Sequence, residues 1–435
     1  MFKFKSICCV IILFFIGFNL NAQDTIKVMH YNLLYYGKTV YDCTSTTNNR
    51  DEKNENLKTI IQYVKPDIFS VNELDGESDA DAKYLLDNAL NVDGVTSYRK
   101  TEFPETYLAN TIFYNVNKLV LKRNNPISYI LGGYKKFFNV FQFYFNSDNL
   151  EVTNDTAFIY CAVTHLKAGN DPNYELQRAY ETSLIMDYFE TLGQKGNYMI
   201  MGDFNVYTPT ETCFQNLINP DNSLYTFYDP ADQIGEWSSN YNYRFVHTQS
   251  THITGDCFSG GGMDDRFDFI LASDYIMNGT NHFEYITDSY KAIGQDGSSY
   301  NGSLNITSNS AVPNNVANAL YNMSDHLPVY LELKVDQNRG EPLIISDSKT
   351  KGIKVFYNNP ASEVLNLQIL PEQPNEFKIE IFTIKGEKIF EYDIVNKSNI
   401  INLNISVLDL PNGIYLLNIT SQKEFIYSSK ILIQN

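Results

Sequence analysis

Six apolar segments of this chain begin or end with a polar residue that can bind a metal ion or move a proton. The segments are VMHYNLL, FSVNELDG, YCAVTHLKAG, MIMGDFNVY, DDRFDFILASD and NMSDHLPVYLEL. In chain order they carry Asn32, Glu73, His165, Asp203 with Asn205, Asp268, and Asp325 with His326. Sites in layered α/β proteins are usually built at strand ends, so these residues form the predicted site.

Taken singly, most of these residues have a structural explanation. Asn32 suits a turn, and a lone histidine such as His165 is more often a hydrogen-bonded core residue than a ligand. The Asp325-His326 pair suits a surface turn with a capping aspartate. Asp268 is different, because a carboxylate in an otherwise apolar strand needs a partner. The whole set, rather than any member, favours a functional site.

The apolar periodicity predicts strands that alternate with helices from Thr25 onward. Strands are expected at 25–34, 67–74, 137–145, 157–165, 198–203 and 267–272, a hairpin at 111–114 and 118–121, and helices at 54–64 and 174–192. In the second helix, one buried side is expected to carry Leu176, Ala179, Leu184 and Phe189. This mixture predicts an α/β domain with two packed mixed β-sheets flanked by helices, a four-layer sandwich.

The six motifs, in this order, resemble the endonuclease/exonuclease/phosphatase superfamily of metal-dependent phosphodiesterases over about residues 25–335. GDFN, RFDFIL and SDHLPV carry the most specific part of the resemblance. Departures from the apurinic endonucleases argue against a repair role: Leu33 and Leu34 follow Asn32, and His165 stands where those enzymes tend to have tyrosine. The THLKAG form is more similar to the deoxyribonuclease-I-like and sphingomyelinase-like branches.

The resemblance implies a Mg²⁺ ion, with Mn²⁺ or Ca²⁺ as alternatives, because oxygen ligands suit these cations. The implied metal residues are Glu73 as main ligand, Asn32 beside it, and Asp325.

The implied catalytic residues divide the remaining work. Asp203 would hold or deprotonate the attacking water or bind a second cation, and Asn205 would bind a phosphate oxygen. His165 would contact the phosphate or protonate the leaving group. Asp268 would fix the tautomer of His326, which would face the phosphate.

The N-terminus reads as a secretory signal peptide over residues 1–22. Lys3 and Lys5 precede an apolar run at 7–20, and Ala22 supplies a small residue at the expected cleavage point. The run is short for a membrane anchor, and no transmembrane segment is expected in the mature chain. The formal net charge of −18 repels free phosphates and nucleic acid at long range, so a function on phosphates needs a local cation.

The C-terminal part changes character after a polar linker at 336–351. From 352 to 435 short alternating strands with turns predict a small all-β sandwich, and no titratable cluster is visible in it. NNPASEVLNLQIL, LPNGIYLLNI and the terminal KILIQN resemble the C-terminal sorting domain of the type IX secretion system of Bacteroidetes. An ordinary binding module is the alternative. The predicted domains are therefore 1–22, 23–335, 336–351 and 352–435.

Four cysteines remain after removal of the signal peptide. Cys161 lies in an apolar strand and is expected to be a buried free thiol. Cys213 and Cys257 lie in loop-like sequence and could pair, which would resemble a disulfide of some secreted deoxyribonucleases. Cys43 has no assigned partner.

Three functions fit the sequence. The first is an exported nuclease acting on DNA or RNA as a monomer, handled by the type IX machinery, with Lys167, Arg178, Arg244 and Arg266 as candidates for contacting a phosphate backbone. The second is a sphingomyelinase-like or inositol-phosphate-type phosphoesterase, for which the apolar segment 129–145 would touch a membrane or, equally, form core strands. The third is a non-catalytic surface binding protein, which the complete set of polar strand ends disfavours.

Overall fold

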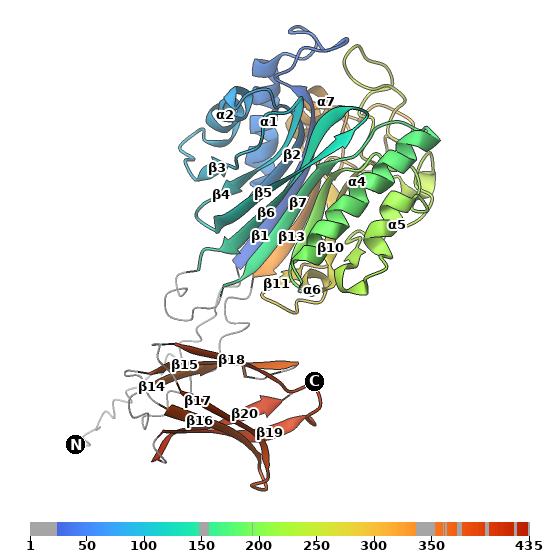
Figure 1. Ribbon diagram of the computed structural model, residues 1–435. Coiled ribbons are helices and arrows are strands. Elements are labelled where there is room, and N and C mark those ends of the chain that lie inside the picture. Colours follow the sequence, from blue (N-terminus) through green and yellow to red (C-terminus); the bar gives the residue numbers. More distant parts are fainter. Residues whose placement is uncertain are drawn as a thin grey trace, which may run out of the picture.

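The computed structural model describes residues 24–147, 156–193, 195–335, 353–359, 361, 363–371, 376–395, 400–421 and 424–433. The predicted signal peptide and the whole of the predicted linker lie outside these ranges. The described residues between 24 and 335 form two packed β-sheets with helices on both outer faces (Figure 1). Within the described residues, no helix is long and apolar enough to cross a membrane.

The first sheet has the strand order β11-β13-β1-β2-β4-β3, with β12 beside β13. Its strands are β1 (Asp24–Tyr36), β2 (Ile68–Asp75), β3 (Tyr98–Lys100), β4 (Leu108–Asn115), β11 (Phe283–Tyr285), β12 (Lys291–Ala292) and β13 (Val329–Val335). The neighbours β1 and β2 are parallel and are joined through helix α1 (Arg50–Val64). Their carboxyl ends therefore meet at one edge.

The second sheet repeats this plan with the order β5-β6-β7-β8-β10-β9. Its strands are β5 (Leu119–Leu131), β6 (Tyr134–Phe145), β7 (Phe158–His165), β8 (Tyr198–Asp203), β9 (Phe227–Tyr228) and β10 (Asp268–Ser273). The parallel pair is β7 and β8, joined through helix α4 (Pro172–Thr191). Each sheet thus contributes the ends of one parallel pair.

Three hydrophobic cores separate four layers, as the sequence predicts. Apolar side chains such as Val28, Phe141 and Ile270 fill the space between the two sheets. The outer face of the first sheet packs on α1, α2 (Ala80–Leu85), the π-helical turn at Leu86–Leu90 and α7 (Asn314–Met323). The outer face of the second sheet packs on α4 and α5 (Thr212–Ile218) (Figure 1). The described residues also contain short helical turns at Ser223–Tyr225 and Tyr241–Tyr243 and the short helix α6 (Asp274–Met277).

Helix α1 forms where its apolar spacing predicts, although it starts four residues earlier. The Asn49 side chain accepts hydrogen bonds from the backbone N–H groups of Asp51 and Glu52, which are otherwise unpartnered at a helix start. Lys65 ends the helix in the left-handed region, with φ of 53°. The predicted apolar positions are buried, among them Leu57 and Ile61.

Helix α4 is also present, but its predicted buried side is partly wrong. Leu176 is 70% exposed, whereas Arg178 is fully buried. The reason is an internal ion pair, in which Arg178 donates from Nε and Nη2 to Glu211 Oε2 at 2.9 and 2.6 Å. A buried guanidinium with a carboxylate partner can take a position that hydrophobic periodicity assigns to an aliphatic side chain.

The predicted hairpin at 111–121 is wrong, although both of its strands exist. β4 pairs with β2 and β3 in the first sheet, whereas β5 pairs with β6 in the second. The turn between them, closed by Lys118 N donating to Asn115 O at 3.1 Å, carries the chain from one sheet to the other. The same residue types form a tight turn whether the two strands that it connects pair with each other or belong to different sheets.

The C-terminal residues form two antiparallel sheets. One contains β14 (Ile353–Tyr357), β15 (Val364–Pro371) and β18 (Ile401–Ser406); the other contains β16 (Glu376–Thr383), β17 (Lys388–Val395), β19 (Gly413–Ser421) and β20 (Glu424–Ile433). Alternate apolar side chains such as Leu367, Ile379 and Leu417 share one core. The predicted all-β character of this part is confirmed.

Candidate active site

Strand pairing in the second sheet brings three of the predicted residues into one row. His165 is the register partner of Asp203 across the parallel pair β7–β8, and Asp203 is the partner of Asp268 across the antiparallel pair β8–β10. In the first sheet Asn32 is the register partner of Asn72, which precedes Glu73. The two rows belong to facing sheets, and their side chains meet at the same end of the sandwich.

Glu73 reaches this meeting point because β2 is irregular there. Its φ is 57°, in the left-handed region, and the pairing of β2 with β4 shifts register between Val71 and Leu74. A non-glycine residue rarely adopts this conformation, which costs about 1–3 kcal/mol and is concentrated at functional sites. The Glu73 carboxylate accepts hydrogen bonds from Asn32 Nδ2 at 3.0 Å and from the Tyr35 backbone N–H at 3.1 Å.

Glu73, His165 and Asp203 form a group with the spacing of metal ligands. One ligand atom from each lies within 4.8 Å of the others. His165 Nε2 is 3.8 Å from Glu73 Oε1 and 3.6 Å from Asp203 Oδ2. Asn32 ties the group together, because its Nδ2 donates to Asp203 Oδ2 at 3.0 Å as well as to Glu73.

The charges of this group suit a cation. Burial raises the pKa of Asp203 to about 8, with Asp268 and Glu73 adding to the rise and His326 opposing it. Burial and the nearby Asp325 carboxylate also raise the pKa of Glu73. Burial and the Lys136 ammonium lower the pKa of His165 to about 3 and keep its imidazole neutral. Carboxylate oxygens and a neutral imidazole nitrogen are the forms that bind metal.

Asp268 and His326 form the buried pair that the sequence predicts. His326 Nδ1 lies 2.7 Å from Asp268 Oδ2, and His326 Nε2 lies 3.7 Å from Asp203 Oδ2. Burial alone would lower the pKa of His326, but Asp268 and Asp203 outweigh it and raise that pKa well above its usual value. The pair can therefore hold a proton beside the carboxylate group.

Asp325 lies near Glu73 but outside the three-residue ligand group. Its Oδ2 accepts hydrogen bonds from the Ser259 backbone N–H at 3.0 Å and from Gln249 Nε2 at 3.3 Å. Asn205, which adopts a φ of 49°, donates from Nδ2 to Leu166 O at 3.2 Å. All eight predicted residues thus belong to one end of the sandwich, and their roles remain predictions.

Several residues of the site were not predicted from the sequence. His30 is fully buried, its Nδ1 lies 2.9 Å from Ser70 Oγ, and its Nε2 lies 3.8 Å from Asp268 Oδ1. Asn72 Oδ1 accepts the backbone N–H of Asp203 at 2.9 Å and so joins the two sheets. His30 stands two residues before Asn32, at a spacing that places both on one side of a strand, and this was the available signal.

Lys53 is a buried cation that was not predicted, and two of the candidate arginines differ from expectation. Lys53 is 3% exposed, and its Nζ donates to Leu34 O at 2.7 Å and to Asn48 Oδ1 at 2.6 Å. Arg178 and Arg266 are fully buried in ion pairs with Glu211 and Asp229, so they cannot contact a phosphate backbone as proposed. Of the four candidates, Lys167 and Arg244 keep accessible side chains.

The disulfide that the sequence allowed between Cys213 and Cys257 does not form. Cys257 is bonded to Cys43, 214 residues away, whereas Cys213 is a buried free cysteine whose thiol contacts Glu211. The bond joins the loop after β1 to the loop that contains Ser259. Cys161 is a buried free thiol, as predicted. Loops that are distant in sequence meet at the site end of the fold. The spacing of cysteines in the sequence does not show which of them are brought together in this way.

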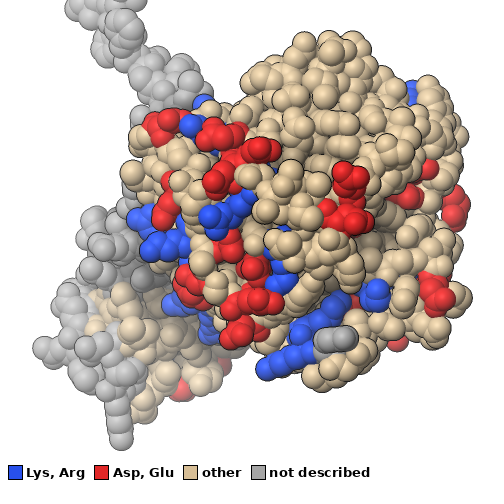
Figure 2. Space-filling view, turned by 90° about the horizontal axis from the view of Figure 1, so that it is seen from above, with Lys and Arg blue, Asp and Glu red and all other residues tan. Residues whose placement is uncertain are grey.

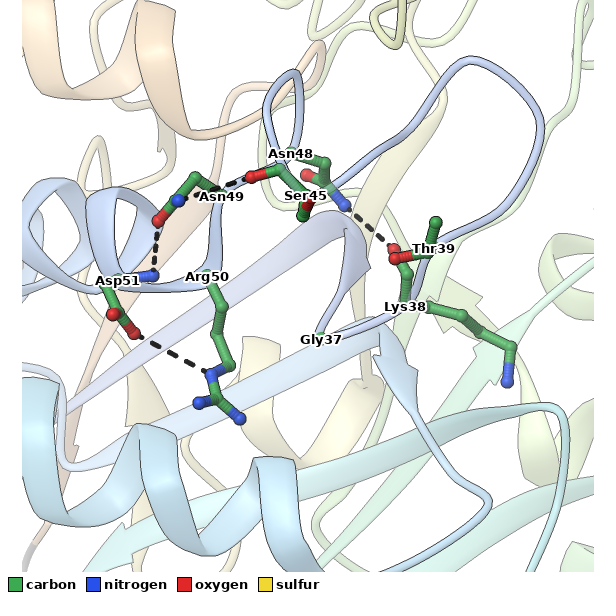
Figure 3. Close-up of a pocket in the computed structure, with 8 residues that line it drawn as sticks. All are labelled: Gly37, Lys38, Thr39, Ser45, Asn48, Asn49, Arg50 and Asp51. Atoms are coloured by element: carbon green, nitrogen blue, oxygen red, sulfur yellow. Dashed lines mark hydrogen bonds and ion pairs between the residues drawn. The ribbon is translucent and has the colours of Figure 1, made fainter.

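A surface pocket is formed by the loop after β1 and the first residues of α1 (Figure 3). Its lining residues are Gly37, Lys38, Thr39, Ser45, Asn48, Asn49, Arg50 and Asp51. Both cationic side chains already have partners, because Arg50 binds Asp81 at 2.9 Å and Lys38 binds Glu77 at 2.8 Å. None of the eight predicted residues lines this pocket, and it gives no evidence of a ligand.

The surface at the site end carries both charges. This end is uppermost in Figure 1 and faces the viewer in Figure 2, where acidic and basic side chains alternate over much of one side. No single broad basic area covers the described part of this face (Figure 2). Attraction of phosphate groups must therefore be local.

Comparison with family models and curated proteins identifies the C-terminal part. Residues 355–434 match the family model of the secretion system C-terminal sorting domain. This match lies within the predicted tail and indicates that the tail directs secretion. No protein with a curated description matches the sequence.

Solved structures similar to this chain include proteins described as endonuclease/exonuclease/phosphatase family members. A humanized TDP2 from D. rerio is 15% identical, covers 71% of this chain and 98% of its own, and has a TM-score of 0.46. An endonuclease/exonuclease/phosphatase family protein from Bacteroides thetaiotaomicron is 16% identical, covers 73% of this chain and 97% of its own, and has a TM-score of 0.45. The human Nocturnin catalytic domain is 16% identical, covers 72% and 98%, and has a TM-score of 0.41. Identities this low leave the function to be inferred from the side chains of the site.

Proposed function

We propose that residues 24–335 form an exported, divalent-metal-dependent phosphodiesterase, and that its substrate is DNA or RNA. The observation that carries this proposal is the adjacency of two units: the ligand group of Glu73, His165 and Asp203, and the Asp268–His326 pair. Asp203 Oδ2 belongs to the first unit and is 3.7 Å from His326 Nε2 of the second. A phosphodiester bound there would meet a cation and a proton carrier together.

The residues of the chain divide the chemistry between them. Glu73 and Asp203 would hold the cation, with Asn32 orienting both carboxylates through its amide. His326, oriented by Asp268, would contact the phosphate and carry a proton to or from it. Asn205 has a second amide hydrogen available for a phosphate oxygen. The bound cation would neutralise charge on the phosphoryl oxygens.

The donor set limits the choice of metal. Oxygen ligands suit Mg²⁺, Mn²⁺ and Ca²⁺, whereas an imidazole nitrogen favours later transition metals. The close approach of His165 to both carboxylates therefore makes Mn²⁺ a strong alternative to Mg²⁺. In the Mg²⁺ form, His165 would contact the substrate rather than the ion.

Aromatic side chains beside Glu73 favour a nucleic-acid substrate. Tyr41 is 86% and Tyr107 52% exposed, and Tyr35 is half-buried next to Glu73. Burial, then Glu73, Tyr107 and Tyr41, raise the pKa of the Tyr35 phenol, so the three phenols are close enough to interact electrostatically. Exposed rings of this kind stack on nucleobases.

The lipid alternative loses its main support. Phe138, Phe141 and Phe143 of the β6 segment are buried in the sheet cores, and Ile130 is the large apolar side chain that the β5 part of the hairpin exposes. A membrane-contacting hairpin would need a larger exposed apolar surface. The segment therefore acts as core strands.

The proposed location follows from the two ends of the chain. A signal peptide at residues 1–22 would take the chain across the inner membrane, and the type IX machinery would then recognise the sorting tail. Removal of the tail would leave the enzyme released or attached to the cell surface. Its substrate would accordingly be extracellular.

A substrate panel tests the proposed function. The purified mature protein is given single-stranded DNA, duplex DNA, RNA, sphingomyelin, inositol phosphates and a generic phosphodiester, each with Mg²⁺, Mn²⁺ or EDTA. We expect cleavage of a nucleic acid that requires the metal and that Glu73→Ala abolishes. Preferential hydrolysis of sphingomyelin or inositol phosphates would contradict the proposed nuclease function. Activity that persists in EDTA would contradict metal dependence.

A further inference from the structure

Gln249 lies on a short segment that is hydrogen-bonded to two site-bearing parts of the chain. Its backbone N–H donates to Asp265 O at 3.1 Å, and its carbonyl accepts the N–H of Asp265 at 3.0 Å. On the other side, Thr251 N donates to Asp325 O at 2.9 Å and Leu327 N to Thr248 O at 2.7 Å. The backbone at Gln249 is therefore fixed between the approach to Asp268 and the Asp325-His326 pair.

The Gln249 side chain spans the two members of that pair. Its Nε2 lies 2.7 Å from His326 Nε2 and 3.3 Å from Asp325 Oδ2. An amide nitrogen carries two hydrogens, so it can donate one to Asp325 Oδ2 and one to His326 Nε2 when that nitrogen is unprotonated and the ring proton is on Nδ1, facing Asp268. When Nε2 carries a proton, it is the donor, and the amide oxygen of Gln249 is the group that can accept from it. Glutamate has a similar length but lacks the amide hydrogens. An aliphatic side chain of this length can form neither the hydrogen bond to His326 nor the one to Asp325.

His326 needs such a second contact to keep its ring in place. Asp268 holds the ring through Nδ1 alone, and a ring held at one nitrogen can still tilt about that hydrogen bond. The opposite nitrogen, Nε2, is the one directed toward Asp203 and the ligand group, at 3.7 Å from Asp203 Oδ2. A displacement of this nitrogen by about 1 Å is enough to cost on the order of 10²-fold in rate.

We propose that Gln249 is a positioning residue that fixes His326 and Asp325 relative to each other. Its amide ties the proton-carrying ring to the carboxylate beside Glu73, so that the two units of the site keep one geometry. The inference rests on the proposed function, because the reaction served is the proposed phosphodiester cleavage. Groups that orient ligands or catalytic residues in this way are typically worth about 10–100-fold in metal affinity or activity.

The test compares Gln249→Ala and the similarly sized Gln249→Leu with a matched control, Gln295→Ala. Gln295 is also buried, and its Nε2 donates to His247 O at 2.9 Å, so it supports the same segment without touching the site. Three quantities are measured: Mn²⁺ affinity by titration calorimetry without substrate, kcat and KM on the substrate that the panel identifies, and Tm.

We expect both Gln249 variants to lower kcat about 10–100-fold with little change in KM, and to weaken Mn²⁺ binding. The control should lower Tm while keeping the kinetics and metal affinity of the wild type. Wild-type kinetics and Mn²⁺ affinity in a folded Gln249→Leu protein would overturn the proposal, and so would an equal loss in Gln295→Ala. If the wild type cleaves no phosphodiester, the proposed function fails, and the Mn²⁺ titration then decides for or against Gln249 by itself.

Discussion

Asp268 Oδ2 lies 2.7 Å from His326 Nδ1, and both side chains are buried at the end of the second sheet. The other oxygen of the same carboxylate faces His30 Nε2 at 3.8 Å. One aspartate therefore lies between two imidazoles, of which it binds one closely. Because that imidazole also approaches Asp203, the effects of Asp268 on catalysis should pass through His326.

This coupling predicts non-additive losses in a double-mutant cycle. His326→Ala should lower kcat by about 10²–10⁴-fold, the usual contribution of a general acid or base. Asp268→Asn should lose part of that rate, since an amide keeps the shape without the charge. The double variant should be little worse than His326→Ala, because both changes act through one ring. A double-variant defect equal to the product of the single defects would mean that the two residues act independently.

Glu73 should be required for metal binding and dispensable for folding. It lies at the end of β2, and its carboxylate makes polar contacts with Asn32 and the Tyr35 backbone, so Glu73→Ala removes little apolar packing. We expect the variant to keep its circular dichroism spectrum, to bind Mn²⁺ at least about tenfold more weakly and to lose turnover. Unchanged Mn²⁺ affinity in a folded Glu73→Ala protein would remove Glu73 from the ligand set.

The stability of the metal-free protein should depend on pH through Asp203. Burial raises the pKa of this carboxyl from 3.8 to about 8, so the folded protein holds a proton that the unfolded chain releases. The stability contributed by this group is complete below about pH 3.8 and is lost as the pH rises toward about 8.

Asp203→Asn isolates this effect, because other buried groups titrate in the same range. In EDTA, the Tm of the wild type minus that of Asp203→Asn should fall steadily from about pH 4 to pH 8. Adding Mn²⁺ at pH 8 should raise the Tm of the wild type more than that of the variant. A difference in Tm that does not vary with pH would show that Asp203 is ionised throughout.

Peptide mapping should find Cys43 linked to Cys257 in the mature protein. Cys161 and Cys213 are buried, and burial raises the pKa of both thiols, so they should react with a thiol reagent only after denaturation. Cys43→Ser with Cys257→Ser should destabilise the fold by about 2–5 kcal/mol, whereas Cys213→Ser keeps the bond. Recovery of a Cys213–Cys257 peptide would reverse this assignment.

The tail should serve export and not catalysis. Deletion of residues 352–435 should leave the kcat and KM of the purified enzyme within about twofold of the full chain, because all the site residues precede position 335. In the native host the same deletion should keep the protein inside the outer membrane. Loss of activity on deletion, with export retained, would contradict both halves of the prediction.

Much of the fold was predictable because the strands of residues 24–335 carry plain apolar patterns. β1, β2, β7, β8 and β10 each lie within two residues of the expected positions. The site residues were predictable for a related reason: each stands where such a pattern begins or stops. The parallel pairs β1–β2 and β7–β8, with the antiparallel neighbours β13 and β10, bring these positions to one end of the fold.

The failures share a physical cause, which is that pairing between distant segments leaves little trace in one sequence. The turn at Asn115 connects two sheets, yet its residues are those of a hairpin. Cys257 forms its disulfide with Cys43, which is 214 residues away in the sequence. Gln249 contacts His326 from a loop whose sequence has no apolar periodicity. Neither its spacing nor its residue type therefore predicted it as a site residue.

The row formed by His165, Asp203 and Asp268 has a consequence for how new specificities can arise on this scaffold. The separation of these residues is set by the fixed spacing of hydrogen-bonded strands, whereas Tyr41, Tyr107 and Gln249 come from connecting segments. Loops tolerate insertion and replacement far better than paired strands do. Substrate preference should therefore be exchangeable by grafting loops from other proteins, while the reaction itself is inherited with the sheet.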